Sequence, residues 1–135
     1  MRPLAASTAV LLYLLQIHPA CADCTEINSQ ASVWRAAFIL AKEDYKRETA
    51  AILGKPFSEE TIAIGIASST KMKIAMDGLI EILDRSMAEG CFGGDAAVWR
   101  DVIEKLKSES DAIDKTIQTY LDMQEKYAKS GTARD

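Results

Sequence analysis

Apolar residues recur every three or four positions along most of this chain, which is the spacing that predicts amphipathic α-helices. The first such stretch covers residues 25–53. Gly54 and Pro56 follow it, and they predict its end because glycine readily adopts the left-handed terminating conformation and proline cannot continue a helix. The apolar positions of this stretch are Ile27, Ala31, Trp34, Phe38, Ala41, Tyr45 and Ile52.

A second helix is predicted over residues 58–89. Ser58 is suited to its start, because a serine hydroxyl can accept hydrogen bonds from the amides of the first turn. Its apolar positions are Ile62, Ile66, Met72, Met76, Leu79, Ile80, Leu83 and Met87.

The middle of the second helix contains residues that weaken helix propensity, namely Gly65, residues 68–70 and Gly78. Two interpretations stay open. Small residues there would let a neighbouring helix pack closely, or the helix is kinked or open and presents apolar side chains to a partner. In the second case the candidate partner-binding residues are Ile64, Ile66 and Ile74.

The stretch from Gly90 to Gly94 predicts a turn, and Asp95 is a good cap for a third helix over residues 95–129. The apolar stripe of this helix has mostly alternating steps of four and three residues, a spacing typical of a coiled-coil seam. Its positions are Trp99, Ile103, Leu106, Ser110, Ile113, Ile117, Tyr120 and Tyr127. Residues 131–135 offer nothing to pack and are predicted to form a disordered tail.

Short connections between helices of similar length favour antiparallel packing of sequential helices. The fold class is therefore all-α, an antiparallel up-down-up three-helix bundle with its domain at residues 23–130. Three amphipathic helices can leave an apolar face uncovered, so the pattern leaves a dimer open.

The N-terminus has the pattern of a signal peptide at residues 1–22. Arg2 precedes a twelve-residue run of apolar or small residues, and Ala20, Cys21 and Ala22 form a small-residue cleavage site before Asp23. The alternatives are a membrane anchor, for which the run is short against the ~20 residues of a spanning helix, and a lipid on Cys21. We expect a periplasmic or secreted protein without stable membrane insertion after cleavage.

Cleavage would leave two cysteines, Cys24 and Cys91, in a compartment where disulfides persist. The two cysteines lie at the start of the first helix and the end of the second, which share one pole of an up-down-up bundle. We therefore predict a Cys24–Cys91 disulfide. Two free thiols or a metal site are the weaker alternatives, since two thiolates alone make a poor zinc site.

The chain has 20 acidic and 16 basic residues and a net charge of −4, which argues against binding to nucleic acid phosphates or anionic lipid. The only histidine, His18, falls in the predicted signal peptide. This leaves no imidazole for a catalytic triad or a di-iron site, and the chain has no glycine-rich nucleotide-binding motif. We expect no enzyme activity, cofactor or metal.

Aromatic residues gather near the cysteine pole of the predicted bundle. Core packing is the ordinary explanation for such residues, and an aromatic-lined pocket for a small apolar ligand is the alternative. The residues concerned are Trp34, Phe38, Phe92 and Trp99.

These features favour an exported, non-enzymatic helical protein that acts through contact with another protein, as an inhibitor, an immunity-type binder or an accessory subunit of an envelope assembly. A bundle offers grooves and helix faces suited to this class. One alternative is a periplasmic stress chaperone that exposes apolar surface when acid neutralises its carboxylates. A further alternative is a carrier of a small apolar ligand.

Overall fold

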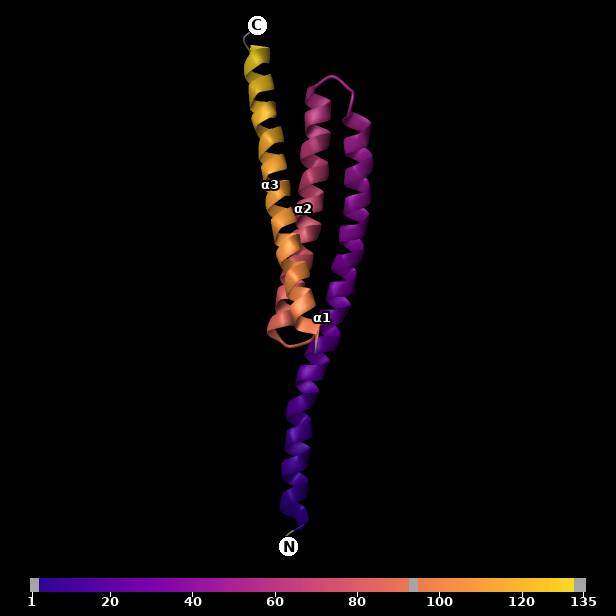
Figure 1. The fold of residues 1–135 in the computed structure, drawn as a ribbon, viewed down its shortest axis with the longest axis vertical. Coiled ribbons are helices and arrows are strands. Elements are labelled where there is room, and N and C mark those ends of the chain that lie inside the picture. Colours follow the sequence, from indigo (N-terminus) through magenta and orange to yellow (C-terminus); the bar gives the residue numbers. More distant parts are fainter. Residues whose placement is uncertain (1–2, 93–94, 133–135) are drawn as a thin grey trace.

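The computed structural model describes the backbone of residues 3–92 and 95–132, and the side chains of residues 24–92 and 95–131. Three long helices account for this part of the chain: α1 (Pro3–Ile52), α2 (Glu59–Ala88) and α3 (Ala96–Thr132). They run up, down and up, and the described residues contain no strand (Figure 1). The predicted all-α, three-helix fold is confirmed.

The helix bounds differ from the predicted ones mainly at the N-terminus. Helix α1 does not begin near Thr25 but continues back to Pro3, and this N-terminal part extends beyond the other helices (Figure 1). The apolar and small residues that suggest a signal peptide also support helix formation, which accounts for the continuity. Cleavage after Ala22 stays a prediction, because a helical backbone is compatible with both a cleaved and a retained N-terminal segment.

At the C-terminus, α3 ends at Thr132, three residues later than predicted. Residues 131 and 132 of the predicted tail are thus helical, because the last turn continues past Ser130. The rest of that tail, residues 133–135, lies outside the described residues.

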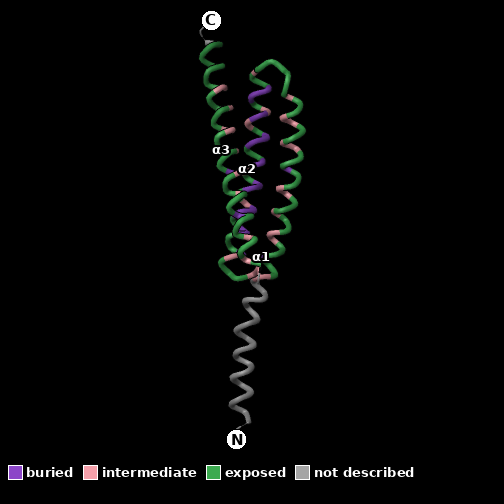
Figure 2. The backbone as a smooth tube through the Cα atoms, viewed as in Figure 1, coloured by how far each residue is buried: buried purple, intermediate pink, exposed green. Residues whose placement is uncertain are grey.

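Helix α2 is the central element, and it packs against both α1 and α3. Among the described residues, α1 and α3 do not approach each other closely at the backbone. Most of the buried positions therefore belong to α2 (Figure 2). The core has two clusters, one of Ile27, Leu79, Ile82, Leu83 and Ile103, and one of Ala41, Met72, Ala75, Met76 and Ile80.

The start of α2 is fixed by a reciprocal pair of hydrogen bonds. The Thr61 amide donates to Ser58 Oγ at 3.2 Å, and the Ser58 amide donates to Thr61 Oγ1 at 2.9 Å. These bonds satisfy two amides that the helix itself leaves without partners. The predicted capping role of Ser58 is confirmed.

The end of α2 is set by Gly90, whose φ of +70° lies in the left-handed region. The Cys91 amide donates to the Ser86 carbonyl at 2.9 Å, and the Gly90 amide donates to the Met87 carbonyl at 3.2 Å. This bonding pattern is the Schellman motif, which satisfies the last carbonyls of a helix. It also fixes where Cys91 leaves the helix.

Helix α2 is continuous through its small residues. An added Cβ at Gly65 would overlap the ring of Tyr120, and one at Gly78 would overlap the indole of Trp34. Ser68 and Ser69 are buried as well. The interpretation that small residues permit close helix packing is therefore confirmed, and the alternative, an opening in the helix, is not observed because α2 runs unbroken from Glu59 to Ala88.

Candidate binding groove

An apolar groove of about 710 Å³ runs between α1 and α3, over the C-terminal half of α2. It exists because α1 and α3 both pack on α2 without approaching each other. Its floor is formed by Leu79 and Leu83 of α2. The remaining lining residues are Asn28, Ala31, Ser32, Arg35, Phe38 and Ile39 on one side and Phe92, Trp99, Val102 and Leu106 on the other.

The aromatic side chains of the groove are partly organised by stacking. The rings of Phe92 and Trp99 are nearly parallel, at an angle of 12°, with their centroids 4.8 Å apart. Phe38 faces them from α1 across the groove. Three of the four residues predicted for an aromatic pocket thus line one groove, whereas Trp34 packs on Gly78 instead.

The α1 side of the groove carries positive charge. Arg35 is among its lining residues, and Lys42 Nζ lies 5.8 Å from the centroid of the Phe38 ring. Within residues 24–92 and 95–131, neither cation forms an ion pair with a carboxylate. No acidic side chain is found among the described residues that line the groove.

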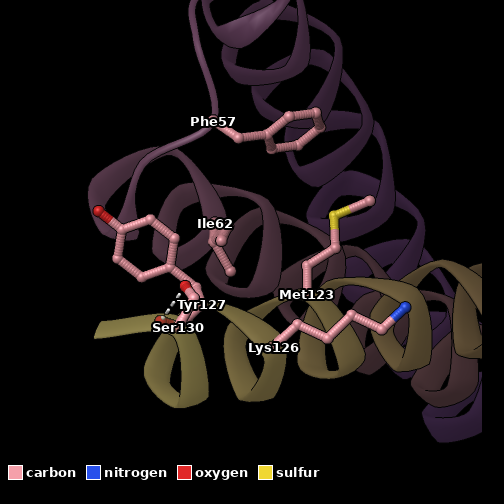
Figure 3. A pocket seen from close by; sticks show the side chains of 6 residues that line it. All are labelled: Phe57, Ile62, Met123, Lys126, Tyr127 and Ser130. Atoms are coloured by element: carbon pink, nitrogen blue, oxygen red, sulfur yellow. Dashed lines mark hydrogen bonds between the residues drawn. The ribbon is translucent and has the colours of Figure 1, made fainter. Parts of the chain in front are cut away.

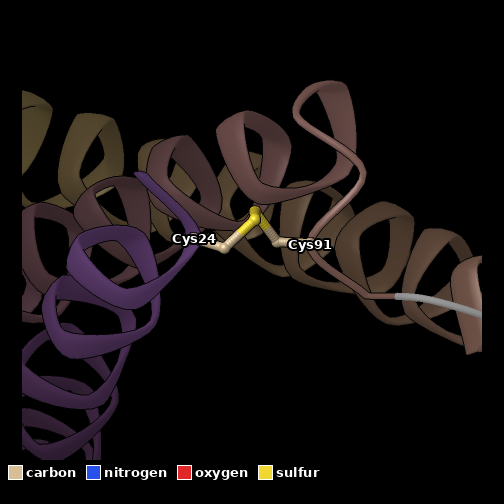
Figure 4. Close-up of a disulfide and its surroundings, with 2 residues drawn as sticks. All are labelled: Cys24 and Cys91. Carbon is tan, nitrogen blue, oxygen red and sulfur yellow. A yellow bond between two sulfur atoms is a disulfide. The ribbon is translucent and has the colours of Figure 1, made fainter. Parts of the chain in front are cut away.

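A disulfide between Cys24 and Cys91 links α1 to the turn that follows α2 (Figure 4). The two Cα atoms are 5.5 Å apart and the residues are 67 positions apart in sequence. Cys24 lies one turn before Asn28, where the α1 wall begins, and Cys91 directly precedes Phe92 of the opposite wall. The bridge therefore joins the two walls, as the shared-pole argument from the sequence predicts.

The partner-binding surface predicted on α2, formed by Ile64, Ile66 and Ile74, is only partly exposed to solvent. Ile74 is 60% exposed, whereas Ile64 and Ile66 are each about half-buried. Of the three candidate residues on α2, only Ile74 is therefore largely exposed. Its role in binding stays a prediction.

A polar cluster between α2 and α3 escaped the sequence analysis. Lys73 Nζ lies 2.9 Å from Asp114 Oδ2 and 3.1 Å from Asp77 Oδ2, and it donates to Ser110 Oγ at 2.6 Å. Ser110 in turn donates to Asp77 Oδ1 at 2.6 Å. Ser110, a serine within an otherwise apolar stripe, could have indicated this cluster, since a buried hydroxyl requires a polar partner.

A second, smaller pocket of about 400 Å³ lies at the opposite end of the molecule, between the α1–α2 loop and the end of α3 (Figure 3). Phe57 from the loop is 69% exposed, so packing against α2 does not bury it. The apolar pattern does not predict this pocket, because the pocket depends on how far α3 extends beside the loop. Its lining consists of Phe57, Ile62, Met123, Lys126, Tyr127 and Ser130.

Two further properties concern chemistry and location. The described residues contain no group of three or more histidine, cysteine or acidic side chains that could hold a metal ion. Among the helices of the described residues, none contains a stretch long and apolar enough to cross a membrane.

Comparison with known proteins gave no relative for this chain. No protein family, no curated protein and no solved structure matches it.

Proposed function

We propose that this protein is an exported, non-enzymatic binding protein that holds an apolar segment of another protein in the groove between α1 and α3. Such binding would suit an inhibitor, an immunity-type binder or an accessory subunit of an envelope assembly. The observation that carries the proposal is the groove itself, which leaves apolar side chains of α1 and α3 open to solvent on either side of the buried Leu79 and Leu83.

Exposed apolar side chains in the groove are the reason to expect a partner. Ile39 is 47% exposed and Val102 is 37% exposed, on opposite walls. Contiguous apolar surface of this kind is costly in water and commonly marks an interaction site. A second protein that covered these residues would remove that cost.

Export is supported by two features of the chain. The disulfide fits an oxidising compartment, where such bonds form and persist. The apolar N-terminal run and small-residue cleavage site add the pattern of a signal peptide. These features support our proposal that the protein acts in the periplasm or outside the cell.

A photo-crosslinking side chain placed at position 102 tests the proposal in intact cells. We expect a covalent adduct with another protein from position 102 and none from position 121. Leu121 is a matched control because it lies on the same helix, is 40% exposed and does not line the groove. Equal adducts from both positions would reject the groove as the binding site.

Two substitutions then distinguish the groove from the exposed α2 surface around Ile74 as the binding site. Val102→Glu should abolish the adduct formed from a crosslinker elsewhere in the groove, because it places a carboxylate in the apolar wall. Ile74→Glu should leave that adduct intact. The reverse pattern would transfer the proposal to the α2 surface around Ile74.

A second candidate, a carrier of a small apolar ligand, is favoured by the groove's volume. About 710 Å³ falls within the range of roughly 300–1,000 Å³ that is usual for small-molecule sites. Native mass spectrometry of the purified protein would show a co-purifying ligand, and Val102→Glu should remove it.

A further inference from the structure

We propose that the segment held by the groove is an amphipathic α-helix whose apolar stripe is flanked by acidic residues. In this proposal Arg35 forms an ion pair with one of these acidic residues. This inference rests on the proposed function and specifies the partner. Shape, openness and charge of the groove each support it.

The shape of the groove matches a helix. Its α1 wall runs from Asn28 to Ile39, with lining residues three or four positions apart over three turns. At 1.5 Å per residue this wall is about 17 Å long. A helix placed between α1 and α3, above the buried Leu79 and Leu83, would complete a four-helix bundle and cover the exposed apolar side chains of the two walls, Ile39 and Val102.

The openness of the groove favours a partner helix over a small molecule. Small-ligand sites usually enclose most of the ligand surface. Here Ile39 and Val102 remain substantially exposed on the two walls. A helix would need only its apolar stripe covered, which is how helices bind in grooves of this kind.

The charge of the groove indicates which residues should flank that stripe. The chain as a whole is acidic, with a net charge of −4. The α1 side of the groove nevertheless carries Arg35 and, beside Phe38, Lys42. A guanidinium without a carboxylate partner is well suited to a bidentate bond with an aspartate or glutamate, so a partner helix with acidic flanks would complement this edge.

Three synthetic helical peptides with one apolar stripe, flanked by Glu, Gln or Lys, test the inference on the purified protein by calorimetry at low salt. We expect the Glu peptide to bind about five- to tenfold more tightly than the Lys peptide, since the two charges at stake are near the surface. Arg35→Glu should reverse this order. Arg100→Glu is the matched control, because Arg100 is exposed on α3 outside the groove.

Each other result overturns the inference in a recognisable way. Equal binding of all three peptides, unaffected by Arg35→Glu, would remove the charge preference and leave the groove's proposed function standing. Failure of all three peptides to bind would reject a helical partner. If dodecanoate bound where the peptides did not, the occupant of the groove would be an anionic amphiphile. If light scattering showed a dimer that Val102→Glu dissociates, the occupant would be a second copy of this chain.

The peptide results are independent of the crosslinking result. An adduct from position 102 together with no peptide binding would keep the proposed function and reject only the helical, acidic partner. Absence of any adduct would reject the function itself. Thermal unfolding of Arg35→Glu provides the folding control, and we expect an unchanged midpoint because Arg35 is exposed.

Discussion

The indole ring of Trp34 lies directly over the backbone of Gly78, so that a Cβ added there would meet ring atoms at less than 3.0 Å. This contact brings α1 close to α2 at the level of the groove. It also explains why Trp34 is absent from the groove lining, since its ring is committed to the helix interface.

Gly78→Ala should therefore destabilise the protein. Helix propensity alone would favour alanine by up to about 1 kcal/mol, but overpacking against a rigid indole ring commonly costs about 1–3 kcal/mol. We expect a net loss in the free energy of unfolding, measured by chemical denaturation. A gain in stability would contradict the observed contact.

Gly131→Ala is the matched control for this substitution. Gly131 lies in α3, and an added Cβ there would meet nothing within 4 Å. The control should be neutral or slightly stabilising, as propensity predicts. In a double-mutant cycle, Trp34→Leu should recover part of the stability lost by Gly78→Ala, because the smaller side chain leaves room for the methyl group.

Most of the fold could be predicted from spacing alone, because a core made of helix faces requires a regular apolar pattern. The three-residue and four-residue steps identify Ile27, Ile62 and Ile103 as core positions, and all three are buried. The helix ends at Gly54 and Gly90 could also be predicted, and both glycines have positive φ. Core positions and helix ends can be predicted because each depends on the residue types within one helix or turn.

The groove could not be predicted in the same way. The sequence marks Phe38, Phe92 and Trp99 as aromatic residues at one pole, but it does not determine how far α1 and α3 stand apart. That separation depends on the angle at which each helix packs on α2. Likewise, the position of Lys73 near Asp114 depends on the register between α2 and α3, which no single-helix pattern reveals.

Lys73 and Tyr120 should make the protein sensitive to alkali. Burial of the Lys73 ammonium acts to lower its pKa, but hydrogen bonds to Asp114 and Asp77, together with their charges, raise the pKa above its ordinary value. Burial, with a smaller contribution from Tyr45, raises the pKa of Tyr120. Both groups thus hold their protons more tightly in the folded protein than in the unfolded chain.

The stability that these groups contribute is present below their ordinary pKa values and is lost as pH rises through the raised ones. We expect the melting temperature to fall above about pH 10, where unperturbed tyrosine and lysine begin to titrate. Lys73→Met should lower stability near neutral pH and flatten this alkaline fall. Lys55→Met is the control, since Lys55 is exposed in the α1–α2 loop, and an identical alkaline fall in both variants would contradict the role of Lys73.

Gly90→Ala tests the end of α2 and the placement of Cys91. An added Cβ at Gly90 would meet nothing within 4 Å, so the cost is confined to the left-handed backbone. We expect a loss of about 1–2 kcal/mol in the free energy of unfolding. Wild-type stability in this variant would show that the chain leaves α2 in another conformation.

Reduction of the Cys24–Cys91 bridge should weaken both the fold and the groove. A bridge that closes a loop of this length typically contributes about 2–4 kcal/mol. Within the described part of α1, Ile27 and Ala41 are the only buried apolar residues, and the other core contacts of this helix come from partly buried side chains such as Trp34 and Phe38, so the bridge adds a covalent link to a modest interface. We expect reductant to lower the melting temperature and the groove's affinity for an apolar peptide, while circular dichroism shows helix content largely retained. Hydrogen exchange should rise most over residues 24–40. The double variant Cys24→Ser/Cys91→Ser should match the reduced protein and show no response to reductant. An unchanged melting curve of the wild-type protein in reductant would exclude the bridge as a structural link.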